Sequence, residues 1–183
     1  MDISQLQFLL DKYQLTPNKV RGQNFLVSDE VLATIIAAAK IEKDDLVLEI
    51  GPGLGALTQK LVEQAKQVVS FEVDKHFQPL LNKLVKVNKN LQIKWQDILS
   101  LTDEQWQNIL FTHKAKHYKV VANIPYYLTS KLINKFVSAK HKPQSMTLLI
   151  QREVAERVIA KKNKHSLLSL AVSFYAQAKM AGL

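Results

Sequence analysis

The chain has 183 residues, of which 47% are hydrophobic, so it can bury the core of one ordinary domain. No apolar run approaches the roughly 20 residues that span a bilayer, the N-terminus lacks the layout of a signal peptide, and the absence of cysteine excludes disulfides and thiolate chemistry. These features indicate a cytoplasmic protein with no membrane partner, and the formal net charge of +9 favours nucleic acid as a partner over a merely basic surface.

The first predicted element is an amphipathic helix over residues 3–13, whose apolar side chains recur near one face. A basic, irregular stretch follows it. Ser28 or Asp29 is suited to cap the next helix, because a short polar side chain can accept an unpaired N–H group of the first turn. We therefore divide the chain into an N-terminal helix and basic loop, residues 1–28, and a larger domain, residues 29–183.

From residue 46 the chain alternates short apolar runs with helical patterns. This alternation predicts an α/β fold in which helices cover both faces of a parallel sheet. Because crossovers between parallel strands are right-handed, the carboxyl ends of the strands meet at one edge, where ligands of such sheets bind. The predicted strands cover residues 46–50, 68–72, 91–95, 120–122 and 146–150, and the later predicted helices cover 57–63, a stretch ending near 87, one beginning near 103, 154–160 and 167–176.

A glycine-rich loop at residues 51–55, Gly-Pro-Gly-Leu-Gly, lies where the first strand turns into a helix. Three glycines in five positions permit unusual backbone dihedrals and the close approach of a ligand. The spacing departs from the G-x-G-x-x-G dinucleotide fingerprint, and the Lys-Ser/Thr ending of a triphosphate-binding loop is absent. Taken alone, the loop also fits a tight structural turn.

Two acidic residues follow the next two predicted strands. Glu72 ends the second strand about twenty residues beyond the glycine loop, where a carboxylate can accept both hydroxyls of an adenosine ribose. Asp97 follows the third strand, where its carboxylate can accept the adenine amino group. Each acid alone is more often a helix cap or a solvated loop residue. Together with the glycine loop, the two acids predict an adenosine-bearing ligand.

Glu49, directly before the glycines, helps to choose among adenosine-bearing ligands. A carboxylate suits neither the pyrophosphate of NAD nor any other phosphate. S-adenosylmethionine carries a sulfonium and an ammonium group instead, so acids around the loop are tolerable or helpful. The sequence therefore predicts S-adenosylmethionine as the cofactor, and the scattered histidines predict no metal site.

Residues 123–126 read Asn-Ile-Pro-Tyr and follow the fourth strand at the same edge. The lone pair of an exocyclic adenine nitrogen is delocalised into the ring, so the amine is a poor nucleophile. Asn123 and a neighbouring main-chain carbonyl can accept hydrogen bonds from this nitrogen and favour its more pyramidal, reactive form. Pro125 makes the turn rigid, and Tyr126 supplies a face on which the base can stack. A capped turn with a core tyrosine is the structural alternative.

In combination, these motifs resemble the ribosomal RNA adenine N6-dimethyltransferase family. The similarity is greatest to its small-subunit (16S rRNA) branch, whose loss confers kasugamycin resistance. That branch dimethylates two adjacent adenines near the 3′ end of small-subunit rRNA, so the resemblance implies rRNA in an immature small subunit as the partner and no need for an oligomer. The motifs that carry it are Gln-Asn-Phe-Leu at 23–26, Glu-Ile-Gly-Pro-Gly-Leu-Gly at 49–55, Glu72, Asp97, Asn-Ile-Pro-Tyr at 123–126 and Gln-Arg-Glu-Val-Ala-Glu-Arg at 151–157.

The resemblance also implies a role for individual residues. Tyr126 is expected to stack on the target adenine and Asn123 to lie between donor and acceptor. The implied donor-binding residues are Asn24, Leu26, Gly51, Glu72, Asp97 and Asn123. Family members usually continue with further strands, an aromatic-containing loop and a small helical domain, so we expect a truncated chain with weak or absent turnover.

Several alternatives remain open. A set of basic residues consists of either RNA phosphate contacts or solvated charges: Lys19, Arg21, Lys161, Lys162, Lys164 and His165. The large-subunit rRNA methyltransferases of antibiotic resistance use the same chemistry on a different substrate. A non-catalytic RNA-binding or ribosome-assembly factor is a second possible class. A nicotinamide oxidoreductase is the third, and the glycine spacing and residues 123–126 disfavour it.

Overall fold

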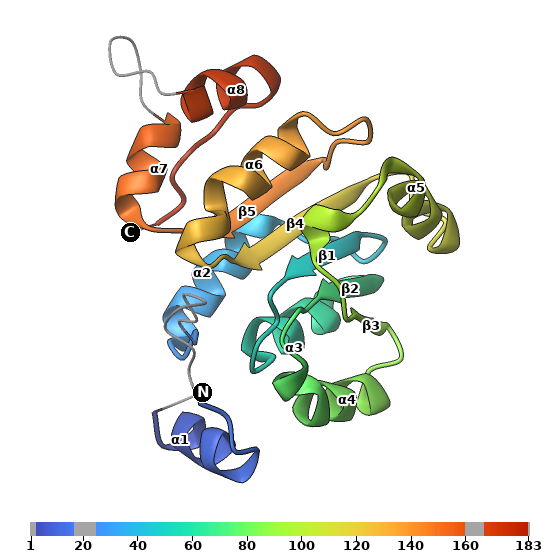
Figure 1. The fold of residues 1–183 in the computed structure, drawn as a ribbon, viewed down its shortest axis with the longest axis vertical. Coiled ribbons are helices and arrows are strands. Elements are labelled where there is room, and N and C mark those ends of the chain that lie inside the picture. The colour runs from blue at the N-terminus through green and yellow to red at the C-terminus, as the bar shows by residue number, and fades with distance from the viewer. Residues whose placement is uncertain (1–2, 17–24, 160–166, 183) are drawn as a thin grey trace.

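The computed structural model describes residues 3–16, 25–159 and 167–182, apart from the side chains of Tyr126 and Leu167. Five parallel strands form one sheet in the order β3-β2-β1-β4-β5 (Figure 1). The chain runs outward from β1 to β3 and then returns to place β4 on the other side of β1, which creates a switch point between β1 and β4. The strands are β1 (Leu46–Ile50), β2 (Gln67–Phe71), β3 (Leu91–Lys94), β4 (Tyr118–Asn123) and β5 (Ser145–Leu149).

Helices connect the strands, and along the chain further helices precede β1 and follow β5. Three short 3-10 helices, η2 (Lys75–Phe77), η3 (Ile98–Ser100) and η4 (Tyr126–Leu128), follow β2, β3 and β4. The sequence analysis assigned no range to α6, between β4 and β5. The α-helices are α1 (Ile3–Lys12), α2 (Asp29–Ala39), α3 (Ala56–Gln64), α4 (Gln78–Val87), α5 (Asp103–Thr112), α6 (Thr129–Val137), α7 (Arg152–Ile159) and α8 (Leu167–Tyr175).

Local hydrogen bonds explain where two of these helices begin. The Ser28 hydroxyl accepts the Val31 N–H at 3.3 Å, so Ser28 rather than Asp29 caps α2. Thr102 and Gln105 form a reciprocal capping box at the start of α5, with distances of 3.0 and 3.2 Å. Both caps satisfy N–H groups that the first helical turn leaves without a partner.

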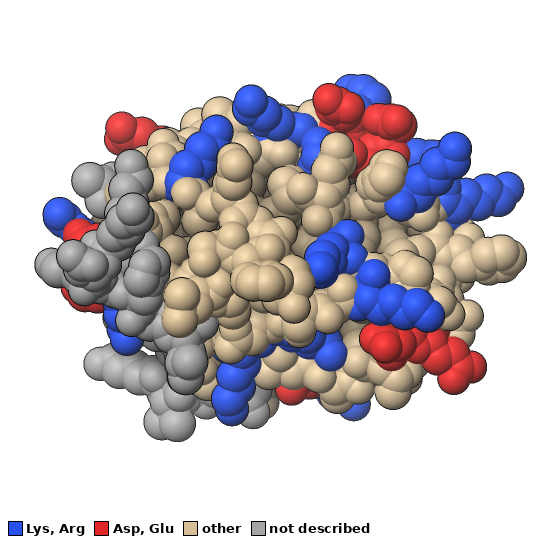
Figure 2. All heavy atoms as spheres, turned by 90° about the horizontal axis from the view of Figure 1, so that it is seen from above, with Lys and Arg blue, Asp and Glu red and all other residues tan. Residues whose placement is uncertain are grey.

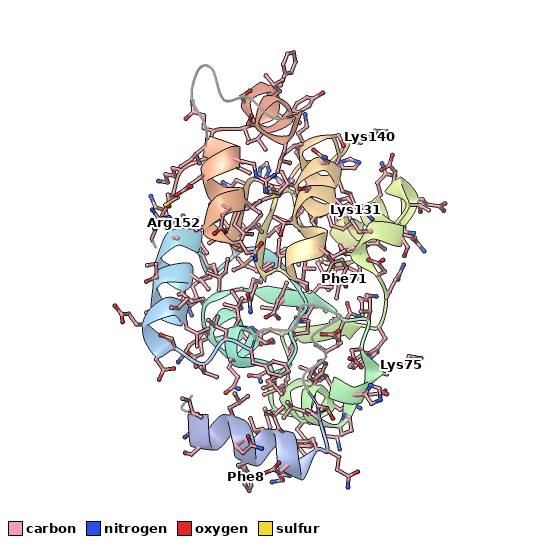
Figure 3. All side chains as sticks on the ribbon, turned by 60° about the vertical axis from the view of Figure 1, so that its left-hand side comes forward. Phe8, Phe71, Lys75, Lys131, Lys140 and Arg152 are labelled. Carbon is pink, nitrogen blue, oxygen red and sulfur yellow. The ribbon has the colours of Figure 1, made fainter. Side chains whose placement is uncertain are left out.

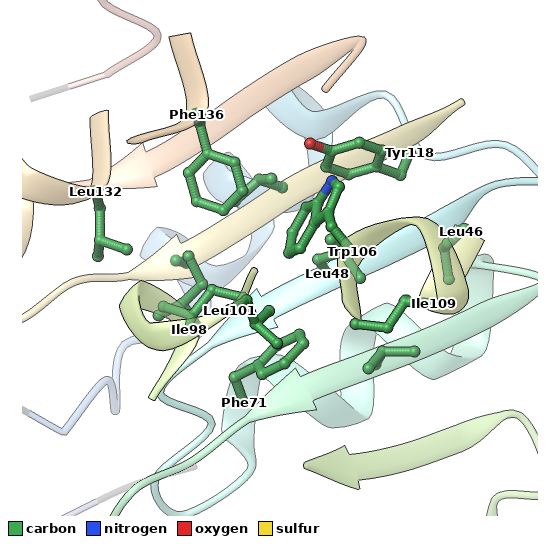
Figure 4. Packing of buried hydrophobic residues seen from close by; sticks show 14 of the residues in the cluster. Leu46, Leu48, Phe71, Ile98, Leu101, Trp106, Ile109, Tyr118, Leu132 and Phe136 are labelled. Carbon is green, nitrogen blue, oxygen red and sulfur yellow. The ribbon is translucent and has the colours of Figure 1, made fainter. Parts of the chain in front are cut away.

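Both faces of the sheet are buried, because the helices that connect parallel strands cover both of them. On one face, Leu48 packs with side chains of α5 and α6, including Trp106 and Phe136 (Figure 4). The rings of Trp106 and Tyr118 meet edge to face, with centroids 5.2 Å apart. On the other face, Val47 packs against apolar residues of α2 and α3. Figure 1 shows the same layers, with α5 and α6 in front of the sheet and α2 behind it.

The strand register aligns the loops at one edge of the sheet. Ile50, the last residue of β1, pairs with Phe71 of β2 and with Ala122 of β4. The segments that leave these three strands therefore lie side by side, although they are widely separated in sequence. Helix α1 packs nearby, with Leu10 in the same apolar cluster as Phe77.

The described residues contain neither a membrane-spanning helix nor a cluster of metal ligands. No helix among them is both long and apolar enough to cross a membrane. Likewise, residues 3–16, 25–159 and 167–182 contain no group of three or more histidine and acidic side chains placed to hold a metal ion.

Candidate active site

A groove opens at the edge where the strands end, and its walls come from the segments that precede α2 and follow β1 to β4. Asn24 and the Tyr126 side chain lie outside the described residues, as do the basic positions 19, 21, 161, 162, 164 and 165. The predicted site residues that line this one groove are Leu26, Gly51, Glu72, Asp97, Asn123 and Pro125.

The glycine loop exposes its backbone to the groove. Gly51, Gly53 and Gly55 have positive φ angles of 69°, 53° and 79°, in the left-handed region that glycine adopts without strain. A Cβ atom built on Gly51 meets no protein atom within 4 Å, so the backbone here borders open space. The Gly51 N–H donates to the carbonyl of Phe71 at 2.9 Å and ties the loop to the end of β2. Figure 3 labels Phe71. The loop can therefore admit a ligand close to its main chain.

Gly55 supports this loop by packing rather than by facing the groove. A Cβ atom at this position collides with Leu84 of α4, and the φ angle of 79° strains any other residue. We expect Gly55→Ala to lower the free energy of unfolding by about 2 kcal/mol in urea titrations. Gln59→Ala, an exposed change on α3, is the matched control and is expected to change it by less than about 0.5 kcal/mol. Equal stability of the two variants contradicts this account of the loop.

Glu72 follows β2 and is held by three main-chain donors. Its Oε1 accepts the N–H groups of Val73 and Asp74, both at 2.8 Å, and its Oε2 accepts that of Gly53 at 3.2 Å. The side chain is only 6% exposed, and burial raises the pKa of its carboxyl above the ordinary value, although these hydrogen bonds oppose the shift. An ionised carboxylate has about four acceptor sites, so Oε2 can still accept a ligand hydroxyl.

Asp97 follows β3 and lines the same groove as the glycine loop. Its Oδ1 accepts the Leu99 N–H at 2.8 Å and caps η3. No described residue donates to its other carboxylate oxygen within hydrogen-bonding distance. Asp97 is therefore both the local cap that such a residue usually forms and an acceptor on the groove wall.

The turn after β4 is fixed by main-chain bonds. Asn123 ends the strand, partly buried, and the next residue, Ile124, is buried and donates its N–H to the carbonyl of Leu149 at 3.2 Å. Pro125 has φ of −55° and ψ of 135°, and its carbonyl accepts the Leu128 N–H at 3.0 Å. The segment is therefore a rigid support that holds Asn123 on the groove wall.

Glu49 requires a correction, because it does not line the groove. It is 1% exposed, and its Oε2 accepts the hydroxyls of Ser70 at 2.6 Å and Thr58 at 2.8 Å. Burial raises the pKa of this carboxyl to about 7, so at neutral pH it carries only part of a negative charge. The sequence argument from its charge beside a ligand therefore does not hold, and Glu72 and Asp97 are the acids that line the groove.

Several apolar groove residues besides Leu26 and Pro125 were given no role in the sequence analysis. Val73 and Tyr127 line the groove with exposed fractions of 55% and 57%, which is high for large apolar side chains. Phe25 and Ile98 add further apolar surface. The sequence could have indicated Val73 and Tyr127 by their positions, because Val73 directly follows Glu72 and Tyr127 directly follows the 123–126 motif. Such walls suit a flat, aromatic ligand group.

Comparisons with known proteins agree with this geometry. The sequence model of the family described as ribosomal RNA adenine dimethylase matches residues 15–181. A curated protein of Dehalococcoides mccartyi named ribosomal RNA small subunit methyltransferase A is 38% identical over 183 residues, which are 99% of this chain and 60% of that protein. The chain thus spans about 60% of the length of such curated relatives.

Two solved structures resemble the fold closely. A dimethyladenosine transferase from Plasmodium falciparum is 31% identical, with a TM-score of 0.68 over 82% of this chain and 52% of its own. The 23S rRNA methyltransferase ErmE is 27% identical, with a TM-score of 0.67 over 82% of this chain and 57% of its own. The sheet and its covering helices are therefore the Rossmann-like fold of class I S-adenosylmethionine-dependent methyltransferases, as the sequence predicted.

Proposed function

Because the chain belongs to the ribosomal RNA adenine dimethylase family, we propose that its groove binds S-adenosylmethionine and presents N6 of an rRNA adenine to the methyl donor. The proposed substrate is a pair of adjacent adenines near the 3′ end of small-subunit rRNA in an immature subunit. The observation that carries this proposal is the convergence of Glu72, Asp97 and Asn123 on one groove beside the glycine loop.

The donor half of the groove fits S-adenosylmethionine. When bound, this cofactor supplies a methyl group activated by a sulfonium centre. Gly51 leaves the main chain open to the methionine moiety, since no protein atom lies within 4 Å of a Cβ built there. Glu72 Oε2 accepts a ribose hydroxyl in addition to the Gly53 N–H, and the second carboxylate oxygen of Asp97 accepts the adenine amino group. Val73 and Ile98 provide apolar surface for the adenine ring.

The acceptor half is the turn at residues 123–126. The side-chain oxygen of Asn123 accepts a hydrogen bond from N6 of the target adenine and favours its nucleophilic form. Tyr126 stacks on the extruded base, and Tyr127, exposed at the groove, offers an aromatic face to a neighbouring base. The rest of the rate enhancement comes from positioning, because methyl transfer is an in-line displacement that needs no metal.

Glu72→Gln is expected to raise the dissociation constant of S-adenosylmethionine about tenfold, because a neutral amide is a weaker acceptor than a carboxylate. Isothermal titration measures the change, and Glu104→Gln, which removes an exposed charge on α5, is the control. Since burial raises the pKa of Glu72, donor affinity should begin to fall on acidification at a higher pH than for an exposed carboxylate. An unchanged constant in the Glu72 variant removes this residue from the donor site.

One other substrate has support from a specific observation. The similarity to ErmE, whose name specifies 23S rRNA, makes a large-subunit adenine the second candidate. The chain is incubated with labelled S-adenosylmethionine and either small or large subunits that lack the methyl groups, and the labelled nucleotides are mapped. Label on adjacent small-subunit adenines supports the proposal, whereas label only on a large-subunit adenine supports the second candidate. Donor binding with no label on either subunit, by a version that also carries the C-terminal part usual in the family, supports a non-catalytic RNA-binding factor.

A further inference from the structure

The edge at which the strands begin, opposite the groove, carries a concentration of lysines. Residues 113–117 lead into β4 and residues 138–144 lead into β5. These two segments contain no aspartate or glutamate, and they carry four of the chain's 25 lysines and arginines. The four, all exposed, are Lys114, Lys116, Lys140 and Lys142. The acids of this edge, Glu42, Asp44 and Asp45, precede β1 instead.

Hydrogen bonds join the two lysine-bearing segments into one surface. The Tyr118 hydroxyl donates to the carbonyl of His141 at 2.7 Å, and the Gln144 N–H donates to the carbonyl of Tyr118 at 2.8 Å. The side chains of Gln107 and His141 are also in contact, with their Nε2 atoms 3.0 Å apart. These bonds link α5, the start of β4 and the loop before β5. The main-chain segments that carry the lysines are therefore held next to one another.

The lysine charges on this surface are available to a partner. Lys114, Lys116 and Lys140 form no ion pair with any described residue. Lys142 Nζ lies 4.1 Å from the centroid of the Tyr175 ring, a contact that leaves its charge uncompensated. The nearby acid Asp45 is already neutralised, since its Oδ2 lies 2.7 Å from Nζ of the buried Lys119.

A shallow hollow with an exposed aromatic ring lies within this surface. Its lining includes Gln107, Asn108, Phe111, Lys116 and His141. Phe111 is 84% exposed, which is unusual for a side chain as large and apolar as phenylalanine. A flat aromatic ring next to amide groups and a lysine is the combination that single-stranded nucleic acids bind, because bases stack on the ring and phosphates pair with the lysine.

The hollow is remote from the groove. Strands of five residues separate the two edges by roughly 16 Å. Figure 3 shows Lys140 near the end of α6, well separated from Phe71 and Lys75 at the groove edge. In Figure 1 the strands begin on the right-hand side, and Figure 2 shows lysine and arginine side chains projecting from that side. A partner bound here does not occupy the groove.

We propose that the edge formed by residues 107–117 and 138–144 is a second RNA-binding site, in which Phe111 stacks on an unpaired base and the surrounding lysines contact phosphates. This edge surface binds RNA whether or not the groove methylates an adenine. The stacking ring and amide groups favour RNA over an acidic protein segment, for which charge alone would suffice.

The test uses a fluorescent 12-nucleotide oligouridylate, whose lack of adenine separates this site from the proposed methylation. Its affinity is measured by anisotropy for the unaltered chain and for a variant with the four edge lysines replaced by glutamine. The control variant replaces Lys12, Lys60, Lys83 and Lys86, exposed lysines on α1, α3 and α4, so both variants carry a net charge of 9 − 4 = +5. Circular dichroism confirms that each variant is folded.

We expect the edge variant to lose at least about tenfold in affinity at low salt. The slope of log K against log salt should fall by about 0.7 for each phosphate contact removed. The control variant should change affinity less than about twofold. Equal losses in the two variants overturn the proposal, because they show binding that depends only on net charge.

Replacements of Phe111 separate base stacking from charge. Phe111→Ala and Phe111→Leu should both reduce oligouridylate affinity about tenfold, since leucine keeps apolar area but cannot stack. Unchanged affinity in both variants overturns the stacking part of the proposal. Competition with polyglutamate completes the test. Polyglutamate and unlabelled oligouridylate are compared at equal total charge for their ability to displace the fluorescent oligouridylate. Equally effective displacement by polyglutamate identifies a surface for acidic peptides instead and overturns the proposal.

Discussion

Asn123→Ala is expected to reduce methyl transfer about a hundredfold or more, while the dissociation constant of S-adenosylmethionine changes only a few-fold. Removing one preorganised hydrogen-bonding group from a reacting centre costs a factor of this size in other enzymes. Donor affinity is largely kept because the other donor-side contacts that we propose, with Gly51, Glu72 and Asp97, are untouched. The rate is measured in single-turnover reactions with the chain in excess over unmethylated small-subunit rRNA.

A second asparagine provides the control for this prediction. Asn134 is exposed on α6, and Asn134→Ala should leave both the rate and the donor affinity unchanged. Transfer by Asn123→Ala at the unaltered rate contradicts the role of this side chain. A large loss of donor affinity with no separate effect on the chemical step instead places Asn123 in donor binding alone.

Glu49 is expected to make the protein less stable as the pH rises from about 4.5 to about 7. Its pKa is raised from 4.5 to about 7 in the folded chain, chiefly by burial, so over this range the folded state holds a proton that the unfolded state has released. Stability therefore falls with rising pH, by about 3 kcal/mol in total for this group. Well below pH 4.5 both states are protonated, and the pH dependence vanishes.

Glu49→Gln isolates this contribution. Glutamine cannot ionise and can still accept the hydroxyl hydrogen bonds of Thr58 and Ser70. Urea titrations at several pH values should show the variant gaining stability relative to the unaltered chain as the pH rises from 4.5 to 7. Glu104→Gln, at an exposed position, serves as the control. Parallel pH profiles for the unaltered chain and the Glu49 variant rule out a raised pKa.

Much of the fold follows from the sequence pattern. The five strands lie where the apolar runs predicted them, with ends shifted by one or two residues, and the fold class and family are confirmed. Helix α6 received no assignment, although Leu132, Ile133 and Phe136 recur at helical spacing. The order of the strands in the sheet did not follow from the pattern, because it depends on pairing between segments far apart in sequence.

The site was predicted through one rule, that parallel strands end at the same edge. That rule brought together Glu72, Asp97 and Asn123, which line the same groove although they follow three different strands. Their chemical roles stay predictions. The orientation of Glu49 could have been anticipated, since alternation along β1 places it with Val47 on the face covered by α3. Tyr127 was not predicted, because the sequence analysis assigned the aromatic role to Tyr126 in the motif directly before it.

The most direct test of the donor groove is a crystal structure of the chain with S-adenosylhomocysteine, the product form of the cofactor. The ribose hydroxyls should lie within hydrogen-bonding distance of the Glu72 carboxylate and the adenine amino group within that of Asp97. The sulfur should face Asn123. A ligand bound outside the groove, or bound there with its ribose away from Glu72, contradicts the account.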